Sequence, residues 1–330
     1  MSYRTLLRST FAFLATLLLS ASAHAGLFRA YVSSTGNDAN ACTLTAPCRL
    51  LPAALAAIND GGEIWMLDSA NYNTGPLNIA KSVTILAVPG ALGSILAISG
   101  SAVSITASGL TISLRNLMIV PLAGGGGASG VLMTGASTLT IENSLIANLP
   151  GDGVNVSGTG KIEIANTIIR NNGLYAVHLA NGASADINGT KMLNNTYGGV
   201  RAFSSSVANT TASVSDSVVS GGTAGLVAFT VVDLPVPPLT VSGGAGLVIT
   251  GPVARIAVTR CTIQSTGFAL VSETTGVGTS VITVSNSMIA NNNFAWNQSG
   301  SGSVIRTLGN NHITDNTNPG PGALSPTALQ

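Results

Sequence analysis

Three polar residues of different chemistry recur at one interval in the middle of this chain. Asn155, His178 and Arg201 lie 23 residues apart, and Asp152 and Tyr175 stand three residues before the first two. An Arg can pair with a carboxylate, a Tyr ring can pack on a pyranose, and a His can take up a proton near neutral pH. We therefore predict that these five residues form a binding site for a sugar acid. The alternative is that they only solvate an outer face. We assign no catalytic residue, because the sequence shows no oriented partner for His178.

The interval of 23 residues belongs to a repeat that covers most of the chain. Aligned copies occupy residues 139–148, 162–171 and 185–194, and further copies centre on Asn116, Asp216, Arg260, Asn286 and Asn310. Each copy alternates apolar and polar residues, is rich in Val, Ile and Thr, and breaks at Asn or Gly. This pattern predicts short strands separated by turns and excludes helical repeats, and a leucine-rich repeat would need Leu at fixed offsets. We therefore predict an all-β solenoid of parallel strands, with coils stacked about 4.7–4.9 Å apart.

Residues at the same phase of successive coils should form columns along the solenoid. Asn recurs at two turn positions, where its side chain tolerates the left-handed conformation. The first turn column is Asn143, Asn166, Asp216, Asn286 and Asn310, and the second is Asn148, Asn171, Asn194, Asn291 and Asp315. Between them, a Ser/Thr column (Ser144, Thr167, Thr190, Ser217, Ser287) and an aliphatic column (Ile146, Ile169, Met192, Val219, Ile263, Ile289, Ile313) should point inward. The position between these two columns then points outward, because side chains alternate along a strand.

Two further outward columns are unusual. Glu163 and Asp186 follow Thr140 at one phase, so two carboxylates should lie one coil apart and either recruit a cation or remain solvated. The second, which we name the apolar column, contains Leu145, Ile168, Lys191, Val218, Thr262, Met288 and His312. An apolar stripe on an outer face predicts self-association or contact with an envelope component, and the alternative is that the loop around Pro235 covers it.

The Asn-Ser/Thr-x-Ile-x-x-Asn pattern of the coils resembles the right-handed parallel β-helix of the pectin lyase-like superfamily. The segment from Tyr31 to Arg49 and the closing Gly309-Asn-Asn-His-Ile-Thr-Asp-Asn resemble the two ends of secreted bacterial β-helix repeat proteins. The resemblance spans roughly residues 30–318. It implies one right-handed parallel β-helix, in a branch whose members mostly have no assigned activity.

Enzymes of that superfamily cleave acidic polysaccharides with clustered carboxylates and a basic residue. Their motifs are absent from this sequence, which has no Asp-Asp pair, Gly-His-Gly, Arg-Ile-Lys or Trp-Ile-Asp-His. We therefore expect a non-enzymatic exported protein that binds a polysaccharide or serves as a structural or adhesive surface protein. The alternative is a polysaccharide lyase or glycoside hydrolase that acts on an acidic polysaccharide around Asp152, Tyr175, His178 and Arg201.

The N-terminus has the features of a secretory signal peptide. Arg4 and Arg8 precede an apolar run over residues 11–19, and Ala23-His-Ala25 supplies small residues before a cleavage site at Gly26. The run is too short for a usual membrane span, so we expect a secreted or cell-envelope protein with residues 1–25 removed. Without Arg4 and Arg8, eleven Lys and Arg face twelve Asp and Glu. That balance argues against a nucleic-acid partner.

Three cysteines and a glycine run complete the candidate chemistry. Cys42 and Cys48, six residues apart in an exported protein, are expected to form a disulfide. Cys261 falls in the inward Ser/Thr column, which indicates a buried filler rather than a reactive thiol. The glycines of residues 124–130 spell Gly-x-Gly-x-x-Gly without a strand-turn-helix context, so we interpret residues 124–130 as a flexible turn between coils. We therefore expect no metal site and no cofactor.

The remaining segments complete the predicted organisation. Residues 26–62 form an N-terminal segment in which residues 49–59 have helical spacing and should cap the solenoid. The β-helix should cover residues 63–315, and residues 316–330, rich in Pro and Gly, should form a flexible tail.

Between Asp216 and Arg260 the interval grows to 44 residues. This segment is either one coil with a long loop or two coils with a Pro-bearing turn. Pro235–Pro238 should project from the stack, because proline cannot donate to a strand ladder.

Overall fold

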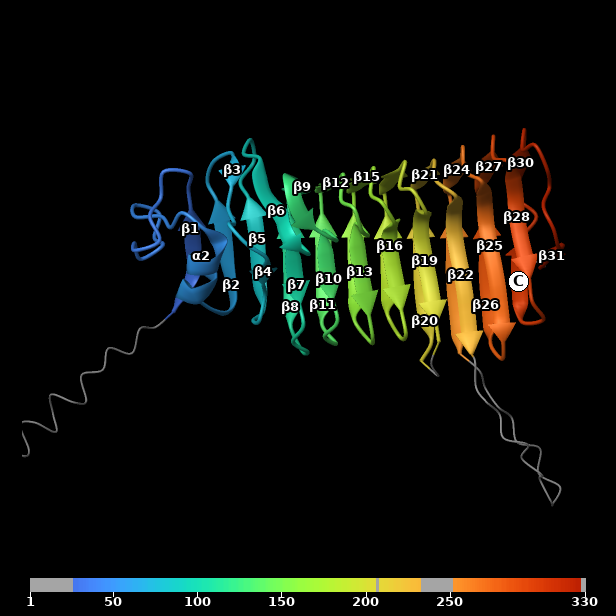
Figure 1. The fold of residues 1–330 in the computed structure, drawn as a ribbon, viewed down its shortest axis with the longest axis horizontal. Helices are drawn as coiled ribbons and strands as arrows, with labels where there is room; N and C mark the ends of the chain where they lie inside the picture. The colour runs from blue at the N-terminus through green and yellow to red at the C-terminus, as the bar shows by residue number, and fades with distance from the viewer. Residues whose placement is uncertain (1–25, 206–207, 233–251, 328–330) are drawn as a thin grey trace, which may run out of the picture.

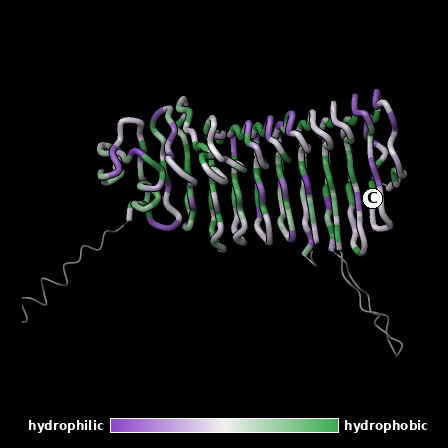
Figure 2. Tube along the Cα trace, in the orientation of Figure 1, coloured by the Kyte–Doolittle hydropathy of each residue, from purple (hydrophilic) through white to green (hydrophobic). Residues whose placement is uncertain are grey.

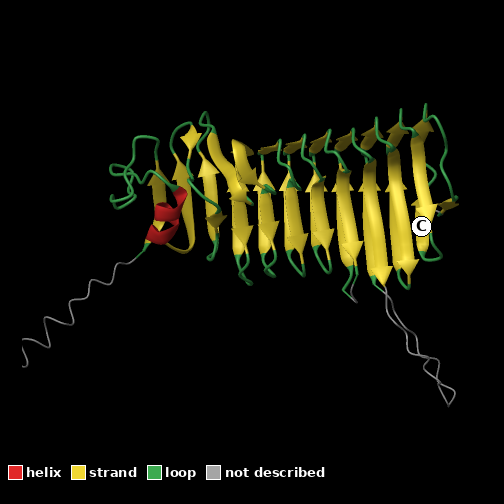
Figure 3. Cartoon of the chain, in the orientation of Figure 1, coloured by secondary structure: helices red, strands yellow, loops and turns green. Residues whose placement is uncertain are grey.

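The computed structural model describes residues 26–205, 208–232 and 252–327 and shows an all-β right-handed parallel β-helix. The solenoid has about nine turns, and its strands lie side by side along the long axis from the N-terminal to the C-terminal end (Figure 1). One helix, drawn in red in Figure 3, lies beside the first strands. The solenoid predicted from the repeat is therefore confirmed.

Three parallel sheets form the walls of the solenoid. The twelve-stranded sheet contains β1 (Leu27–Val32), β2 (Ile58–Met66), β5 (Val83–Ala87), β8 (Thr111–Arg115), β11 (Thr138–Glu142), β14 (Lys161–Ala165), β17 (Ser184–Asn188), β20 (Thr210–Ser215), β23 (Val253–Thr259), β26 (Thr279–Ser285), β29 (Ser303–Thr307) and β31 (Leu324–Pro326). The ten-stranded sheet contains β3 (Ala70–Asn71), β6 (Gly93–Gly100), β9 (Leu117–Gly127), β12 (Leu145–Ala147), β15 (Ile168–Arg170), β18 (Lys191–Leu193), β21 (Val218–Ser220), β24 (Thr262–Gln264), β27 (Met288–Ala290) and β30 (His312–Thr314). The nine-stranded sheet contains β4 (Leu77–Asn78), β7 (Val103–Ile105), β10 (Val131–Met133), β13 (Val154–Ser157), β16 (Tyr175–Ala180), β19 (Gly198–Ser204), β22 (Ala224–Val232), β25 (Phe268–Gly276) and β28 (Phe294–Ser299).

The Asn columns are the corners of the ten-stranded sheet. Asn143 and Asn166 have φ values of 49° and 50°, and Gly189 takes the same corner one coil later with φ 58°. The second corner is equally left-handed at Asn148 and Asn171, with φ values of 62° and 55°. The left-handed conformation is strained for residues other than glycine, and Asn tolerates it better than most. The repeated Asn therefore fixes where each coil turns.

The interior consists of the columns that the sequence predicts to point inward. Thr167, Ile169 and Ile164 of one coil are fully buried, and the equivalent residues of neighbouring coils pack above and below them. Figure 2 shows hydrophobic residues recurring along the strands from coil to coil. The hydroxyls of the Ser/Thr column are also hydrogen-bonded: Thr167 Oγ1, for example, donates to the carbonyl of Ala165 at 2.9 Å. The core is therefore a thin stack in which neighbouring coils supply both apolar contact and backbone hydrogen bonds.

The long interval between Asp216 and Arg260 is a single coil with an insertion. Strand β21 pairs directly with β24, so that Val219 lies opposite Ile263. Strands β20 and β23 pair in the same way on the twelve-stranded sheet. Pro235–Pro238 lie outside the described residues.

Several predicted boundaries differ from the structure. The helix α2 spans Leu51–Ala57 rather than residues 49–59, because the backbone is already extended at Ile58. The first strand is β1, before the helix, and it pairs with β2. Residues 124–127 are not a turn: they end strand β9, where Gly126 and Gly127 pair with β6 after a bulge.

The end of the chain also differs from the flexible tail that its composition predicts. Residues 324–326 form β31, which pairs with β29, and Thr327 donates a backbone hydrogen bond to the carbonyl of Thr307. Pro326 is tolerated because it lies in an edge strand.

Candidate functional site

The in-register ladder of the nine-stranded sheet and the turn before it bring all five predicted site residues into contact. Asn155 of β13 pairs with His178 of β16, and His178 pairs with Arg201 of β19. Their neighbours Val154, Val177 and Val200 are fully buried. The predicted phase is therefore correct, and the polar column lies on the outer face of this sheet.

Asp152 lies at the base of the site rather than on its surface. It is only 2% exposed, whereas the sequence predicts an outward position for it. The difference arises from the turn before β13, which folds Asp152 under the neighbouring coil so that its carboxylate accepts hydrogen bonds. Asn155 Nδ2 donates to Asp152 Oδ2 at 2.7 Å, and the backbone N–H of Tyr175 donates to Oδ1 at 3.0 Å. These bonds compensate the burial of the carboxylate.

His178 lies between the carboxylate and the guanidinium. Its Nδ1 is 3.4 Å from Asp152 Oδ2, and its Nε2 is 3.5 Å from Arg201 Nη1. A carboxylate can only accept, so the tautomer that satisfies it carries the proton on Nδ1 and leaves Nε2 with a lone pair. In that tautomer Nε2 accepts from Arg201 Nη1, because a guanidinium can only donate.

Aromatic rings hold Arg201 in place. Its guanidinium lies 4.6 Å from the ring centre of Phe203 and 5.5 Å from that of Phe229. It is also 5.7 Å from the ring of Tyr175. Such cation–π contacts leave the guanidinium nitrogens available for hydrogen bonding, and no carboxylate pairs with Arg201 among the described residues. Arg201 is therefore a cation positioned to receive an anion.

Tyr175 and Tyr197 form the wall of a shallow pocket of about 250 Å³ at this site. The two rings are stacked with their centres 5.8 Å apart, and Tyr197 is 48% exposed. Burial raises the pKa of the Tyr175 phenol, against an opposing effect of the Arg201 charge. Leu174, Asp152, His178 and Arg201 complete the lining. The pocket thus combines an aromatic wall, an imidazole and a guanidinium.

Sequence reasoning missed Tyr197 and the two phenylalanines. Tyr197 lies in the turn before β19, outside the aligned phases, and Phe229 follows Phe203 by 26 residues rather than 23. The ring centres of Phe203 and Phe229 are 5.7 Å apart. The sequence could have indicated this stack, because both phenylalanines occupy nearly the same position in successive coils.

The other predicted surface columns are also in register. Glu163 and Asp186 are exposed neighbours on the twelve-stranded sheet. In the described part of the chain, no group of three or more His, Cys, Asp or Glu side chains has metal-binding proximity. In the apolar column, Ile168 and Met288 are each 38% exposed, and the charged Lys191 lies between them.

The cysteines lie far from this pocket in the chain. Cys42 and Cys48 form a disulfide in the loop between β1 and α2. Cys261 is a buried free thiol, and its burial raises the pKa of the thiol. Its Sγ contacts the carbonyl oxygens of Thr259 and Val214 at 3.3 and 3.4 Å.

Comparisons with known proteins agree with this architecture. A family model described as the right handed beta helix region matches residues 101–231. The chain is also similar to the solved structure of pectate lyase Pel9A, with a TM-score of 0.57 and 15% identity over 89% of this chain and 81% of that one. The chain therefore has the fold of a right-handed parallel β-helix protein.

Two further structures resemble this β-helix protein. An alginate lyase from Paenibacillus sp. str. FPU-7 has a TM-score of 0.60 and 11% identity, over 91% of this chain and 100% of that one. XylC in complex with xylose has a TM-score of 0.63 and 8% identity, over 87% and 70% of the two chains. At these identities the likeness shows the fold alone. The sequence matches no curated protein.

Proposed function

We propose that this β-helix protein is a lyase that binds an acidic polysaccharide in the Tyr175–His178–Arg201 pocket and cleaves it by β-elimination. The observation that carries the proposal is that His178 contacts Asp152 through one ring nitrogen and Arg201 through the other. The carboxylate of Asp152 orients the imidazole, and the imidazole lies beside a cation that has no carboxylate partner among the described residues. A uronate unit needs both groups: a cation for its carboxylate and a base for the proton on the adjacent carbon. The pectate lyase and alginate lyase structures of the same fold support this choice of substrate class.

The chemistry follows from the order of these groups. Arg201 binds the uronate carboxylate, which draws its guanidinium away from His178 Nε2. Nε2 then takes the proton from the carbon next to the carboxylate, and the electron pair of that C–H bond forms the new carbon–carbon double bond. The bond from the neighbouring ring carbon to the glycosidic oxygen breaks, and the leaving oxygen receives a proton. Tyr175, kept as a phenol by burial, can supply that proton.

A glycoside hydrolase fits the pocket less well. Hydrolysis of a glycosidic bond generally uses two carboxyl groups that flank the bond, one as acid and one as base or nucleophile. Among the described residues that line the pocket, Asp152 is the one carboxylate, and its bonds to Asn155 and Tyr175 hold it below the surface. The site therefore favours elimination over hydrolysis.

The non-enzymatic function that the sequence favours has no support in the structure. That interpretation depends on missing family motifs, whereas the three coils assemble an oriented His and a cation from residues that match none of those motifs. The enzymatic alternative is therefore the proposed function.

The test measures unsaturated product by ultraviolet absorbance after the protein meets pectate, alginate and other uronate polymers. Wild type is expected to form product from at least one polymer, and His178→Ala to lose about 10²–10⁴-fold in rate. His312→Ala is the matched control, because this exposed histidine lies on the ten-stranded sheet. Retention of the polymers without product would support the binding protein instead, and equal rates for His178→Ala and wild type would refute the role of His178.

We propose that the protein acts after export. Residues 1–25, the predicted signal peptide, lie outside the described residues. The Cys42–Cys48 disulfide supports an oxidising compartment, and no helix among the described residues is long and apolar enough to cross a membrane. N-terminal sequencing of the protein from the culture medium or the periplasm tests this, with a start at Gly26 as the expected result and an intact Met1 as the contrary one.

Two structural roles predicted from sequence also stay proposals. Helix α2 buries Leu51 and Ala54 beside β1, which supports a role as the cap of the N-terminal end. Leu51→Asp should then expose the first coils to early proteolysis, and an unchanged digestion pattern would contradict the cap.

Self-association through the apolar column should disappear in Ile168→Lys, as measured by sedimentation. A monomer at all concentrations of wild type would contradict it.

A further inference from the structure

A second pocket lies on a different sheet from the proposed lyase site. It has a volume of about 380 Å³ and lies at the corner between the twelve- and ten-stranded sheets. Its floor comes from the ends of β5, β8 and β11, and the loop after β5 forms one wall. Asn116 fixes that loop, because its Nδ2 donates to the carbonyl of Ala87 at 2.9 Å. The pocket is therefore built into the first coils.

The polar side of this pocket is an ion pair with both donors and acceptors. Arg115 Nε and Nη2 contact Glu142 Oε2 at 2.6 and 2.5 Å. Within the described residues, Arg115 Nη1 and Glu142 Oε1 have no hydrogen-bond partner. The Arg115 and Glu142 side chains are 48% and 24% exposed. The pair therefore offers a donor and an acceptor side by side while its net charge is zero.

The apolar side of the pocket adjoins this ion pair. Leu86 and Pro89 line it, and Leu86 lies in register between Trp65 of the preceding coil and Arg115 of the following coil. Trp65 is held in place by Glu63, which accepts from its Nε1 at 3.1 Å, and by the Arg29 guanidinium 4.0 Å from its ring centre. An apolar wall thus continues from the pocket onto an aromatic side chain.

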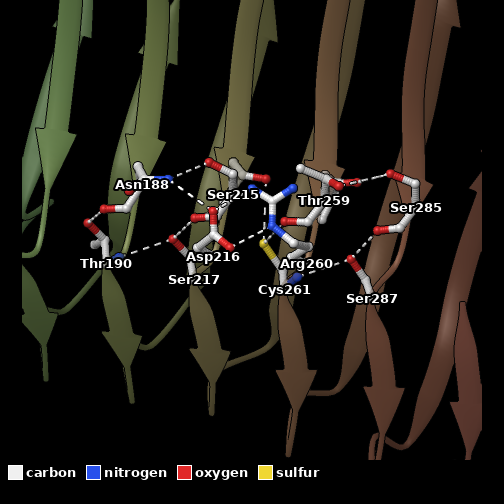
Figure 4. Close-up of polar contacts among 12 residues, drawn as sticks. Asn188, Thr190, Ser215, Asp216, Ser217, Thr259, Arg260, Cys261, Ser285 and Ser287 are labelled. Carbon is white, nitrogen blue, oxygen red and sulfur yellow. Dashed lines mark hydrogen bonds and ion pairs between the residues drawn. The ribbon is translucent and has the colours of Figure 1, made fainter.

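This combination is confined to the first coils. The same row of the twelve-stranded sheet continues through Ala165, Asn188, Ser215, Thr259 and Ser285. Figure 4 shows hydrogen bonds at two steps of the later row: Asn188 Nδ2 donates to Ser215 Oγ at 2.8 Å, and Ser285 Oγ donates to Thr259 Oγ1 at 3.1 Å. The later row therefore carries short side chains, two pairs of which bond each other, whereas the Arg115–Glu142 step leaves a donor and an acceptor open.

We propose that the Arg115–Glu142 pocket binds a neutral pyranose unit of a polysaccharide. The free guanidinium N–H and carboxylate oxygen suit neighbouring hydroxyl groups, which both donate and accept, and Leu86 and Pro89 suit the C–H face of the ring. An anion would face the Glu142 carboxylate, and a cation would face Arg115. The pocket therefore takes an uncharged sugar, unlike the site at Arg201.

The inference does not depend on the proposed lyase activity. Two sites on different sheets could engage one branched or mixed polymer at once, which would raise the apparent affinity without any new contact.

The test uses hexasaccharides of xylose, mannose and glucose with the full mature protein, followed by saturation-transfer NMR and calorimetry. Wild type is expected to bind at least one of them, and the double variant Arg115→Ala with Glu142→Ala to bind it about tenfold more weakly or worse. The pair is partly exposed, so its removal costs little stability and the variant should fold.

Two controls separate this pocket from other effects. The pair Asp216→Ala with Arg260→Ala removes a more exposed ion pair at a later corner and should leave binding unchanged. His178→Ala should also leave it unchanged, whatever its effect on uronate polymers. No binding of any hexasaccharide by wild type, or equal binding by the Arg115 and Glu142 double variant, would overturn the proposal, as would a loss confined to His178→Ala.

Discussion

Asp152 decides what the neighbouring imidazole can do. Its carboxylate is buried and receives the Asn155 amide, the Tyr175 backbone N–H and the His178 ring. A carboxylate that is 2% exposed and already accepts from these neighbours has the role, in the proposed reaction, of holding the tautomer and the orientation of His178. Asp152 is thus a positioning residue.

Asp152→Asn tests this role. The amide can still accept the Tyr175 N–H, but it can present an N–H to His178 Nδ1 and favour the opposite tautomer. We expect kcat to fall by about 10²–10⁴-fold with little change in KM, because the base is lost while Arg201 remains. Asp186→Asn, on the exposed outer face of another sheet, is the control. A rise in KM alone would place Asp152 in substrate binding.

A second carboxylate matters for stability. Burial alone would raise the pKa of Asp68, but hydrogen bonds from Tyr72, Ser34 and Ser33 outweigh it and lower the pKa below the usual value. A carboxyl whose pKa is lowered by folding stabilises the fold above its unfolded pKa, and this contribution is lost as the pH falls through the folded pKa.

Asp68→Asn should therefore destabilise the protein most at neutral pH. The difference from wild type should shrink as the pH falls through the acid range, because wild type then loses the same contribution. Urea unfolding midpoints across this pH range measure it. Asp186→Asn should show no such trend, and a difference independent of pH would mean that the carboxylate charge is unimportant.

At the scale of the elements, the corners set the path of the chain. Asn166 has φ 50°, and the equivalent residue of the next coil is Gly189 with φ 58°. We expect Asn166→Ala to lower the free energy of unfolding by about 1 kcal/mol, because alanine is strained in the left-handed region. Asn166→Gly should be close to neutral there. Chemical denaturation of the two variants makes the comparison, and equal losses would show that the Asn side chain matters rather than its backbone.

The repeat explains which elements could be predicted from sequence. Phases such as Asn155–His178–Arg201 follow from a constant interval, and strand alternation then gives their direction. Asp152 and Tyr197 lie in turns, where alternation no longer applies, so neither the burial of Asp152 nor the exposure of Tyr197 could be derived. Changes of interval hide partners in the same way, as with Phe203 and Phe229.

Gly198, at the start of β19, is under a steric constraint that the sequence pattern does not reveal. Gly198 has φ 149°, and a Cβ there would lie 1.7 Å from the carbonyl oxygen of Ala224. No other side chain allows β22 to approach β19 so closely. The position of Tyr197 and the entry of the chain into β19 therefore both depend on this glycine.

At the scale of the whole molecule, the long interval between Asp216 and Arg260 raises the question of whether the stability of the solenoid depends on the inserted segment. Strand β21 pairs with β24 and β20 with β23 as if the coils were consecutive. We expect replacement of residues 234–250 by a short Gly-Ser linker to leave the thermal midpoint unchanged within a few degrees, because the coil pairs are retained. Differential scanning calorimetry measures this, and a large loss would mean that the inserted segment packs on the solenoid.

The constant step between coils gives the molecule a unit of length. Duplication of residues 286–309 would keep every downstream column in phase, since the interval is one full coil. Most such duplications would only make the protein longer by one step. Between β16 and β19, however, an added coil would double the separation of His178 and Arg201. The fold can thus grow or shrink in whole coils almost anywhere, while three adjacent coils must remain as they are.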